Sequence, residues 1–172
     1  MMLAVILKGP SEPPAPGALV HLTIEVRNLT DRPLWMVGVL DGSEEGLRYP
    51  HYRPGLTSPT VEPSWLRPEP MPLSDMVAPL RLQDFCHLQP GEGFDPTVPR
   101  DGAAYQPLKT FASFRPPAPG RYEFRLTLST DSDQDEEWLG IVGYPGQDEV
   151  LKRLAQVPRL HLESNTAIIE VR

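Results

Sequence analysis

The sequence predicts an all-β protein, an antiparallel β-sandwich of seven or eight strands with a long proline-rich insertion and one short helix near the C-terminus. Several segments alternate apolar and polar residues, which is the pattern of a strand that covers a core with one face. Three Pro-Gly pairs, at 16–17, 90–91 and 119–120, mark turns before apolar or alternating segments. Only one segment has a clear helical period, so alternating strand and helix units are not indicated.

The first half of the chain contains three expected strands. Segment 3–7 is apolar, 20–27 alternates apolar with polar residues, and 34–40 is nearly all apolar. A turn at 28–33 separates the second strand from the third. From 41 to 79 neither strand nor helix period appears and prolines are frequent, so we expect a proline-rich insertion without regular structure.

The second half begins with apolar anchors within 80–88, which lead to a Pro-Gly turn and a short expected strand at 92–98. Segment 105–114 fits either a short helix or a strand. The clearest strand is 122–128, where Tyr, Phe and two Leu residues alternate with polar residues. We expect this strand to lie over the core.

An insertion at 129–163 is expected to contain an acidic loop and the helix. Segment 138–144 has a strand-like composition. Segment 147–157 is the best helix candidate, because its acidic residues occupy the first turn and its basic residues lie further along, as the helix dipole favours. A turn and a final strand follow within 164–172.

The length and cysteine content indicate a single domain, 1–172, in a reducing compartment. A chain of this length removes roughly 70% of its unfolded surface from water. Cys86 is the only cysteine, which excludes an internal disulfide, so we expect a cytoplasmic protein. The apolar start, 1–7, has no basic residue before it and is far shorter than the roughly 20 residues that span a bilayer. We therefore expect no membrane association.

The charge distribution argues against nucleic acid as a partner. The chain has 16 basic and 23 acidic residues, a formal charge of −7, whereas phosphate binding needs a basic face. Between Arg125 and Lys152 lie seven acidic residues and no Lys or Arg. The whole excess of negative charge is therefore concentrated in one segment.

Four short motifs follow the expected strand framework: LTIEVRNLTDRP at 22–33, LQPGE at 88–92, PGRYEF at 119–124 and SNT at 164–166. Together they resemble bacterial immunoglobulin-like accessory domains, which include the intracellular proteinase inhibitor type and sandwich modules attached to some secreted peptidases. Tyr122, entering its strand just after the turn, also resembles a tyrosine corner. The resemblance implies an immunoglobulin-like sandwich with a binding or inhibitory role, and a peptidase as one target. It supplies no inhibitory residue and leaves 41–79 and 129–163 without counterparts.

The sequence assigns no catalytic residue and no cofactor. It has no Gly-x-Ser-x-Gly elbow, Walker loop or Gly-x-Gly-x-x-Gly turn. Cys86 and His87 are neighbours that would point to opposite faces of a strand, which is poor geometry for a nucleophile and its base. A metal-dependent hydrolase with loop carboxylates is one alternative, and a structural homodimer that pairs exposed sheet edges is another.

Asp131, Asp133 and Asp135 are the candidate metal ligands. Their one, three, five spacing is the spacing of carboxylates in a calcium loop. An EF-hand is excluded, because position six is Glu136 rather than glycine and position twelve is Val142 rather than glutamate. A looser divalent site is the alternative to a solvated acidic loop.

The candidate protein-binding residues lie in the proline-rich insertion. Tyr, Trp and Arg are enriched in binding hot spots, and a stiff backbone lowers the cost of ordering on association. The candidates are Arg48, Tyr49, Tyr52, Arg53, Trp65 and Arg67. In the alternative interpretation the aromatic residues fasten the insertion onto the sandwich. We expect a protein partner, and the sequence specifies no oligomeric state.

Overall fold

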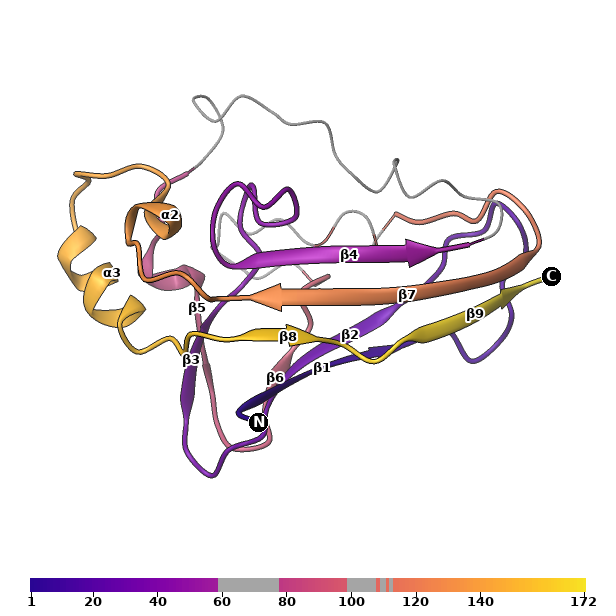
Figure 1. Ribbon diagram of the computed structural model, residues 1–172, viewed down its shortest axis with the longest axis horizontal. Coiled ribbons are helices and arrows are strands. Elements are labelled where there is room, and N and C mark those ends of the chain that lie inside the picture. The colour runs from indigo at the N-terminus through magenta and orange to yellow at the C-terminus, as the bar shows by residue number, and fades with distance from the viewer. Residues whose placement is uncertain (59–77, 99–107, 109–110, 112) are drawn as a thin grey trace.

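The computed structural model describes residues 1–58, 78–98, 108, 111 and 113–172 (Figure 1). Every strand pair in this part of the chain is antiparallel, which confirms the all-β class. The strands are β1 (Leu3–Lys8), β2 (Thr23–Asn28), β3 (Leu34–Val37), β4 (His51–Thr57), β5 (Phe85–Leu88), β6 (Gly93–Phe94), β7 (Gly120–Ser129), β8 (His161–Glu163) and β9 (Ala167–Val171). One sheet has the order β1-β2-β6, a second is β3-β5, and the third is β4-β7-β8 with β9 also on β7.

Strand β7 is the centre of the largest sheet. It is 10 residues long and pairs with β4 along one edge and with β8 and β9 along the other (Figure 1). The expected apolar face is buried, and its members are Tyr122, Phe124, Leu126 and Leu128. The Tyr122 hydroxyl donates to the carbonyl of Ala118 at 2.8 Å, a bond of the tyrosine-corner type that closes the preceding turn onto the strand.

Strand β4 lies inside the segment that was expected to contain no strand, so that prediction is wrong for His51–Thr57. Pro54 and Gly55 in its middle interrupt the apolar alternation and hide the strand from the sequence pattern. The N–H of Tyr52 donates to the Ser43 carbonyl, away from β7. Because N–H directions alternate along a strand, position 54 also faces away from β7, and a proline there removes no ladder hydrogen bond.

The helices are short and lie at one end of the sheets (Figure 1). Helix α3 (Gln147–Leu154) is the expected helix, although it ends before Val157. Helix α2 (Glu136–Leu139) and its following loop replace the strand-like segment 138–144, because Gly140 and Gly143 have φ angles of 73° and 78° that interrupt extended backbone. A 3₁₀ turn, η2 (Leu82–Asp84), precedes β5. Among the described residues, no helix is long and apolar enough to cross a membrane.

The sheets and helices share one hydrophobic core. Its largest fully buried side chains are Trp138, Tyr52, Tyr122, Phe111 and Phe124. Segment 105–114, expected as a helix or a strand, lies mostly outside the described residues, but Leu108, Phe111 and Phe114 are described and are buried.

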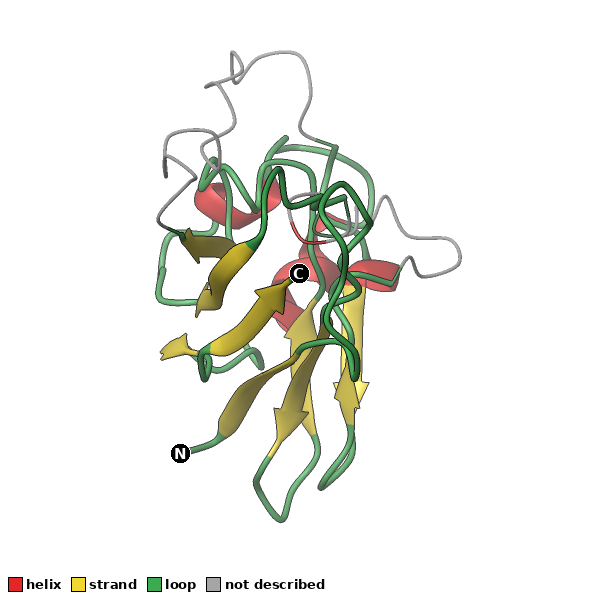
Figure 2. Cartoon of the chain, turned by 90° about the vertical axis from the view of Figure 1, so that its right-hand side faces the viewer, coloured by secondary structure: helices red, strands yellow, loops and turns green. Residues whose placement is uncertain are grey.

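Asn165 joins the β1 sheet to the β7 sheet, which lie next to each other (Figure 2), and it connects the end of β1 to the break between β8 and β9. The Asn165 side-chain oxygen accepts a hydrogen bond from Leu7 N–H at 2.7 Å, and its amide donates to the Leu7 carbonyl at 2.9 Å. Asn165 itself lies in the break between β8 and β9. Its amide group therefore takes the place of a backbone partner on the outer edge of β1.

Replacing this amide should loosen the contact between the two sheets. We expect Asn165→Ala to lower the free energy of unfolding by about 1 to 2 kcal/mol, since two hydrogen bonds are lost and water can replace them only in part. Urea denaturation followed by circular dichroism measures the change. Gln156→Ala, at an exposed helix end, is the control and should change stability by less than about 0.5 kcal/mol. Equal stability of the two variants would contradict a joining role for Asn165.

Candidate functional site

A buried ion pair anchors the start of the proline-rich insertion. Arg48 is 2% exposed, and its Nη1 donates to Oδ1 of Asp41 at 3.0 Å and to the Ala78 carbonyl at 2.6 Å. Its Nη2 donates to the Trp138 carbonyl in α2 at 2.5 Å. Oδ2 of Asp41 accepts a hydrogen bond from the Ala78 N–H at 2.6 Å. This cluster ties together both ends of the insertion and the helical segment.

Burial lowers the pKa of the Arg48 guanidinium, because desolvation disfavours the charged form, while the carboxylate of Asp41 opposes this effect. A charge in this position is stable only with its partners in place. Arg48, predicted as a binding residue, therefore has its charge directed at the interior of the protein.

Tyr52 also faces the core. It is 0% exposed, and its hydroxyl donates to the Val37 carbonyl at 2.8 Å. Its ring thereby fixes β4 to the end of β3. This is the position described by the alternative interpretation, in which the aromatic residues fasten the insertion to the rest of the fold.

Tyr49 is half-buried in an aromatic stack. Its ring centroid lies 3.8 Å from that of His51 and 5.6 Å from that of Trp138. Its N–H donates to the Glu137 carbonyl at 2.8 Å. Desolvation lowers the pKa of His51, the positive charge of Arg53 acts in the same direction, and Glu137 opposes both. The stack holds β4 against α2 and leaves only part of the Tyr49 ring accessible.

Arg53 is exposed and lines a hollow of about 430 Å³ on the sheet. We call the residues that point outward around it the outer face: Arg53, Gly55 and Thr57 of β4, Glu123, Arg125 and Thr127 of β7, and Glu163 of β8. In the strand register, Arg53 lies opposite Thr127, which lies opposite Glu163. In the neighbouring row, Gly55 lies opposite Arg125. The hollow exists because Gly55 supplies no side chain where a strand residue would normally cover its partner.

The two arginines of the outer face have no ion-pair partner among the described residues. Arg125 Nε donates to Thr166 Oγ1 at 2.9 Å, which leaves its Nη groups without a carboxylate. The guanidinium of Arg53 lies against Gly46, where a Cβ would overlap Nη2. Glu123 pairs with Arg121 at 3.0 Å, outside the hollow. Arg53 and Arg125 therefore form no ion pair with another described residue, although Glu123 and Glu163 line the same hollow.

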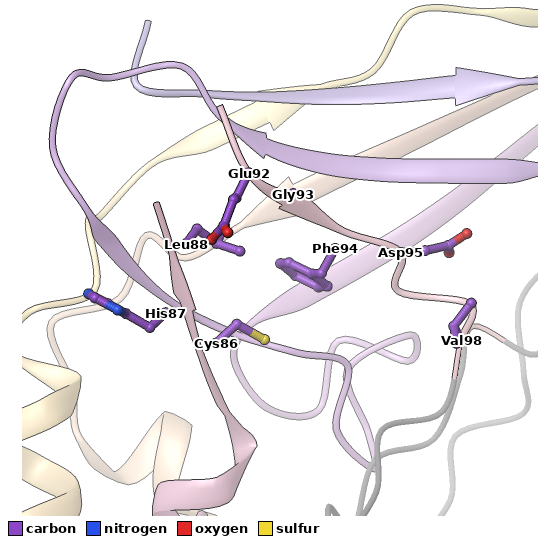
Figure 3. Close-up of a pocket in the computed structure, with 8 residues that line it drawn as sticks. All are labelled: Cys86, His87, Leu88, Glu92, Gly93, Phe94, Asp95 and Val98. Atoms are coloured by element: carbon purple, nitrogen blue, oxygen red, sulfur yellow. The ribbon is translucent and has the colours of Figure 1, made fainter. Parts of the chain in front are cut away.

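A second hollow of about 430 Å³ lies between β5 and β6. Cys86, His87 and Phe94 all line this hollow, and the His87 ring is directed away from the Cys86 thiol and the Phe94 ring (Figure 3). His87 is exposed and stacks on Trp35, with ring centroids 4.3 Å apart. Cys86 and His87 lie on opposite faces, as strand alternation predicts, so the two side chains do not form a nucleophile and base.

The candidate metal ligands are not brought together. Asp131, Asp133 and Asp135 are exposed, and Asp133 lies 3.7 Å from the guanidinium of Arg159. In 1–58, 78–98 and 113–172 no group of three or more His, Cys, Asp or Glu side chains is placed to hold a metal ion. Of the remaining sequence candidates, Trp65 and Arg67 lie outside the described residues.

Six of the seven outer-face residues were not among the sequence candidates: Gly55, Thr57, Glu123, Arg125, Thr127 and Glu163. Arg125 and Glu163 are ordinary polar residues of outward strand positions, and only the pairing with β4 and β8 brings them together. Gly55 gave no signal, because β4 itself is hidden from the sequence pattern.

Comparison of the chain with family models, curated proteins and solved structures found no match. The structure thus defines an all-β class with antiparallel sheets and a polar, hollowed outer face. The resemblance to immunoglobulin-like accessory domains remains a prediction from four short motifs.

Removing the buried guanidinium should destabilise the whole protein. We expect Arg48→Met to lower the free energy of unfolding by about 3 kcal/mol or more, because Asp41 loses its counter-charge in a desolvated position. The double variant Arg48→Met with Asp41→Asn should recover part of this loss. Guanidinium chloride denaturation of both variants measures the coupling. Additive effects of the two substitutions would show that the ion pair is not a unit.

The half-buried His51 should make stability depend on pH. Its pKa in the folded protein lies below the usual 6.5, so the unfolded chain binds the proton more tightly. The contribution of the neutral His51 ring to the free energy of unfolding is therefore fully present above pH 6.5, and it is lost as the pH falls toward the pKa of the folded protein. NMR titration of the His51 ring should give a midpoint below 6.5, and His51→Gln should flatten this part of the stability profile. A midpoint at or above 6.5 would refute the expected burial effect.

Proposed function

We propose that this chain is a non-enzymatic module that binds another protein through the outer face of β4, β7 and β8. The observation that carries the proposal is the hollow above Gly55, which Arg53 and Arg125 line without ion-pair partners in the described part of the chain. Arginine is among the residue types that supply most of the energy in protein interfaces. Arg53 is also the exposed member of the sequence candidates whose positions are described, since Arg48 and Tyr52 are buried and Tyr49 is half-buried.

Protected sheet edges favour binding through this face rather than by strand addition. On β4 the N–H of Tyr52 already donates a hydrogen bond to the Ser43 carbonyl, and Pro54 has no N–H. On β1 the Asn165 side chain occupies both backbone groups of Leu7. Edges protected in this way pair poorly with another strand. This weighs against the alternative of a homodimer formed through these two edges.

The hydrolase alternative has less support from the described residues. It needs convergent carboxylates, but Asp131, Asp133 and Asp135 are exposed and form no metal-binding group there. We place the module in the cytoplasm, because Cys86 is the single cysteine of the sequence and cannot form an internal disulfide, which suits a reducing compartment. A peptidase is one target, as the motif resemblance implies.

Site-specific photo-cross-linking in cells of the organism that produces the protein tests the proposal. A benzoylphenylalanine at Thr57 on the outer face should trap a discrete partner, and one at Gln156 should not. Arg53→Gln with Arg125→Gln should reduce the Thr57 product by about tenfold, since charge-assisted contacts are lost. The folded protein should remain intact, because both side chains are exposed.

The matched control is Arg27→Gln with Arg115→Gln, which removes the same charge away from the hollow. This control should leave the Thr57 product unchanged. If both double variants lose the Thr57 product equally, the effect comes from net charge alone. If neither double variant loses the product, the outer-face arginines do not take part in the interaction.

A further inference from the structure

We propose that the hollow above Gly55 receives a carboxylate side chain from an extended segment of the partner protein, with a basic side chain of the same segment facing Glu163. The inference rests on the proposed function and specifies the chemistry of the partner. Its parts are the two arginines, the single unpaired acid of the outer face, and the space that the glycine leaves.

The arginines are suited to a carboxylate. Arg125 is fixed through its Nε by Thr166 Oγ1, so its two Nη groups are available in a defined plane. The Arg53 guanidinium lies beside Gly46, in space that a Cβ at this position would occupy. A guanidinium held in one orientation binds a carboxylate through two parallel hydrogen bonds with little further loss of entropy.

The two arginines reach the hollow from adjacent strands. Arg53 lies opposite Thr127, and Arg125 lies opposite Gly55, so the two are diagonal neighbours on adjacent strands. Diagonal neighbours are about 7 to 8 Å apart, within reach of long side chains. The Arg53 guanidinium contacts Gly46 and the Arg125 guanidinium contacts Thr166, so a carboxylate in the hollow between them would be attracted to both.

Glu163 restricts the ligand to a segment of mixed charge. It is exposed in the same row as Arg53 and Thr127 and has no ion-pair partner among the described residues. Together with Glu123 it would repel a polyanion such as a nucleic acid or a phosphate cluster. A segment with one acidic and one basic side chain matches both signs of charge.

The dimensions fit a few side chains on an extended backbone. A volume of about 430 Å³ is at the lower end of the range for ligand pockets. A Cβ placed on Gly55 meets only Arg125, at 3.9 Å, and the residue does not have a positive φ. The space above Gly55 is therefore open, and a larger side chain there would fill the hollow without strain in β4.

The experiment uses NMR titration of the ¹⁵N-labelled full chain with three blocked peptides of the sequences Thr-Glu-Thr-Lys-Thr, Thr-Gln-Thr-Lys-Thr and Thr-Glu-Thr-Gln-Thr. The first peptide should give saturable shifts at the amides of Gly55, Arg125 and Thr127. Each glutamine-containing peptide should bind about tenfold more weakly, because each loses one charge-assisted contact. Inorganic phosphate is titrated in parallel and should bind more weakly than the first peptide.

Two variants provide the structural controls. Gly55→Val, which fills the hollow, should abolish the peptide shifts while the spectrum of the core residues is retained. Arg27→Gln with Arg115→Gln should bind the first peptide as the wild type does. Binding that survives in Gly55→Val would overturn the inference.

The remaining outcomes separate the inference from the proposed function. If no peptide binds while the Thr57 cross-link still depends on Arg53 and Arg125, the outer face binds a protein but not through this charge pattern, and the inference fails alone. Tighter binding of phosphate than of the first peptide would also overturn it, since the site would then select a dianion. If the cross-link is also absent, both proposals fail.

Discussion

The buried pair of Arg48 and Asp41 is the interaction on which the rest of the structure depends. The Arg48 guanidinium is removed from water and is stable only beside the partly buried carboxylate of Asp41, and it also requires the carbonyls of Ala78 and Trp138. Because these partners come from both ends of the insertion and from α2, the pair fixes where the insertion leaves and rejoins the fold. Strand β4 follows directly and is thereby held in register beside β7.

The proposed binding surface is a consequence of this anchoring. Once β4 is aligned with β7, Gly55 lies opposite Arg125 and a hollow opens between polar rows. The same segment supplies Gly46, against which Arg53 rests. The two arginines thus have complementary roles. Arg48 anchors the loop that contains Gly46, and the exposed Arg53 packs against that loop. Protected edges on β1 and β4 leave the face of the sheet as the more accessible surface for recognition.

Strands with strict alternation were predictable, and segments whose structure depends on distant partners were not. The pattern of 122–128 identifies the central strand because one face must be apolar wherever it covers a core. Strand β4 was hidden, since a proline within a strand is acceptable mainly at an edge, and edge position is a property of the sheet. Arg48 reads as a surface residue in sequence, because the carbonyls that satisfy it lie 30 and 90 residues away. For the site, Arg53 was predicted, but its neighbours on β7 and β8 were not.

The central position of β7 also bears on how the chain reaches its native state. Each of its pairings joins segments that are far apart in sequence, as in His51 with Ser129 or Gly120 with Val171. Such a topology has a high contact order. The chain must lose the entropy of closing long loops before the stabilising contacts of the sheet can form. During synthesis β4 has no partner until β7 has emerged, and one edge of β7 stays open until β8 and β9 follow. Pro54 therefore has a second effect: before β4 pairs with β7, the missing N–H makes β4 a poor template for aggregation.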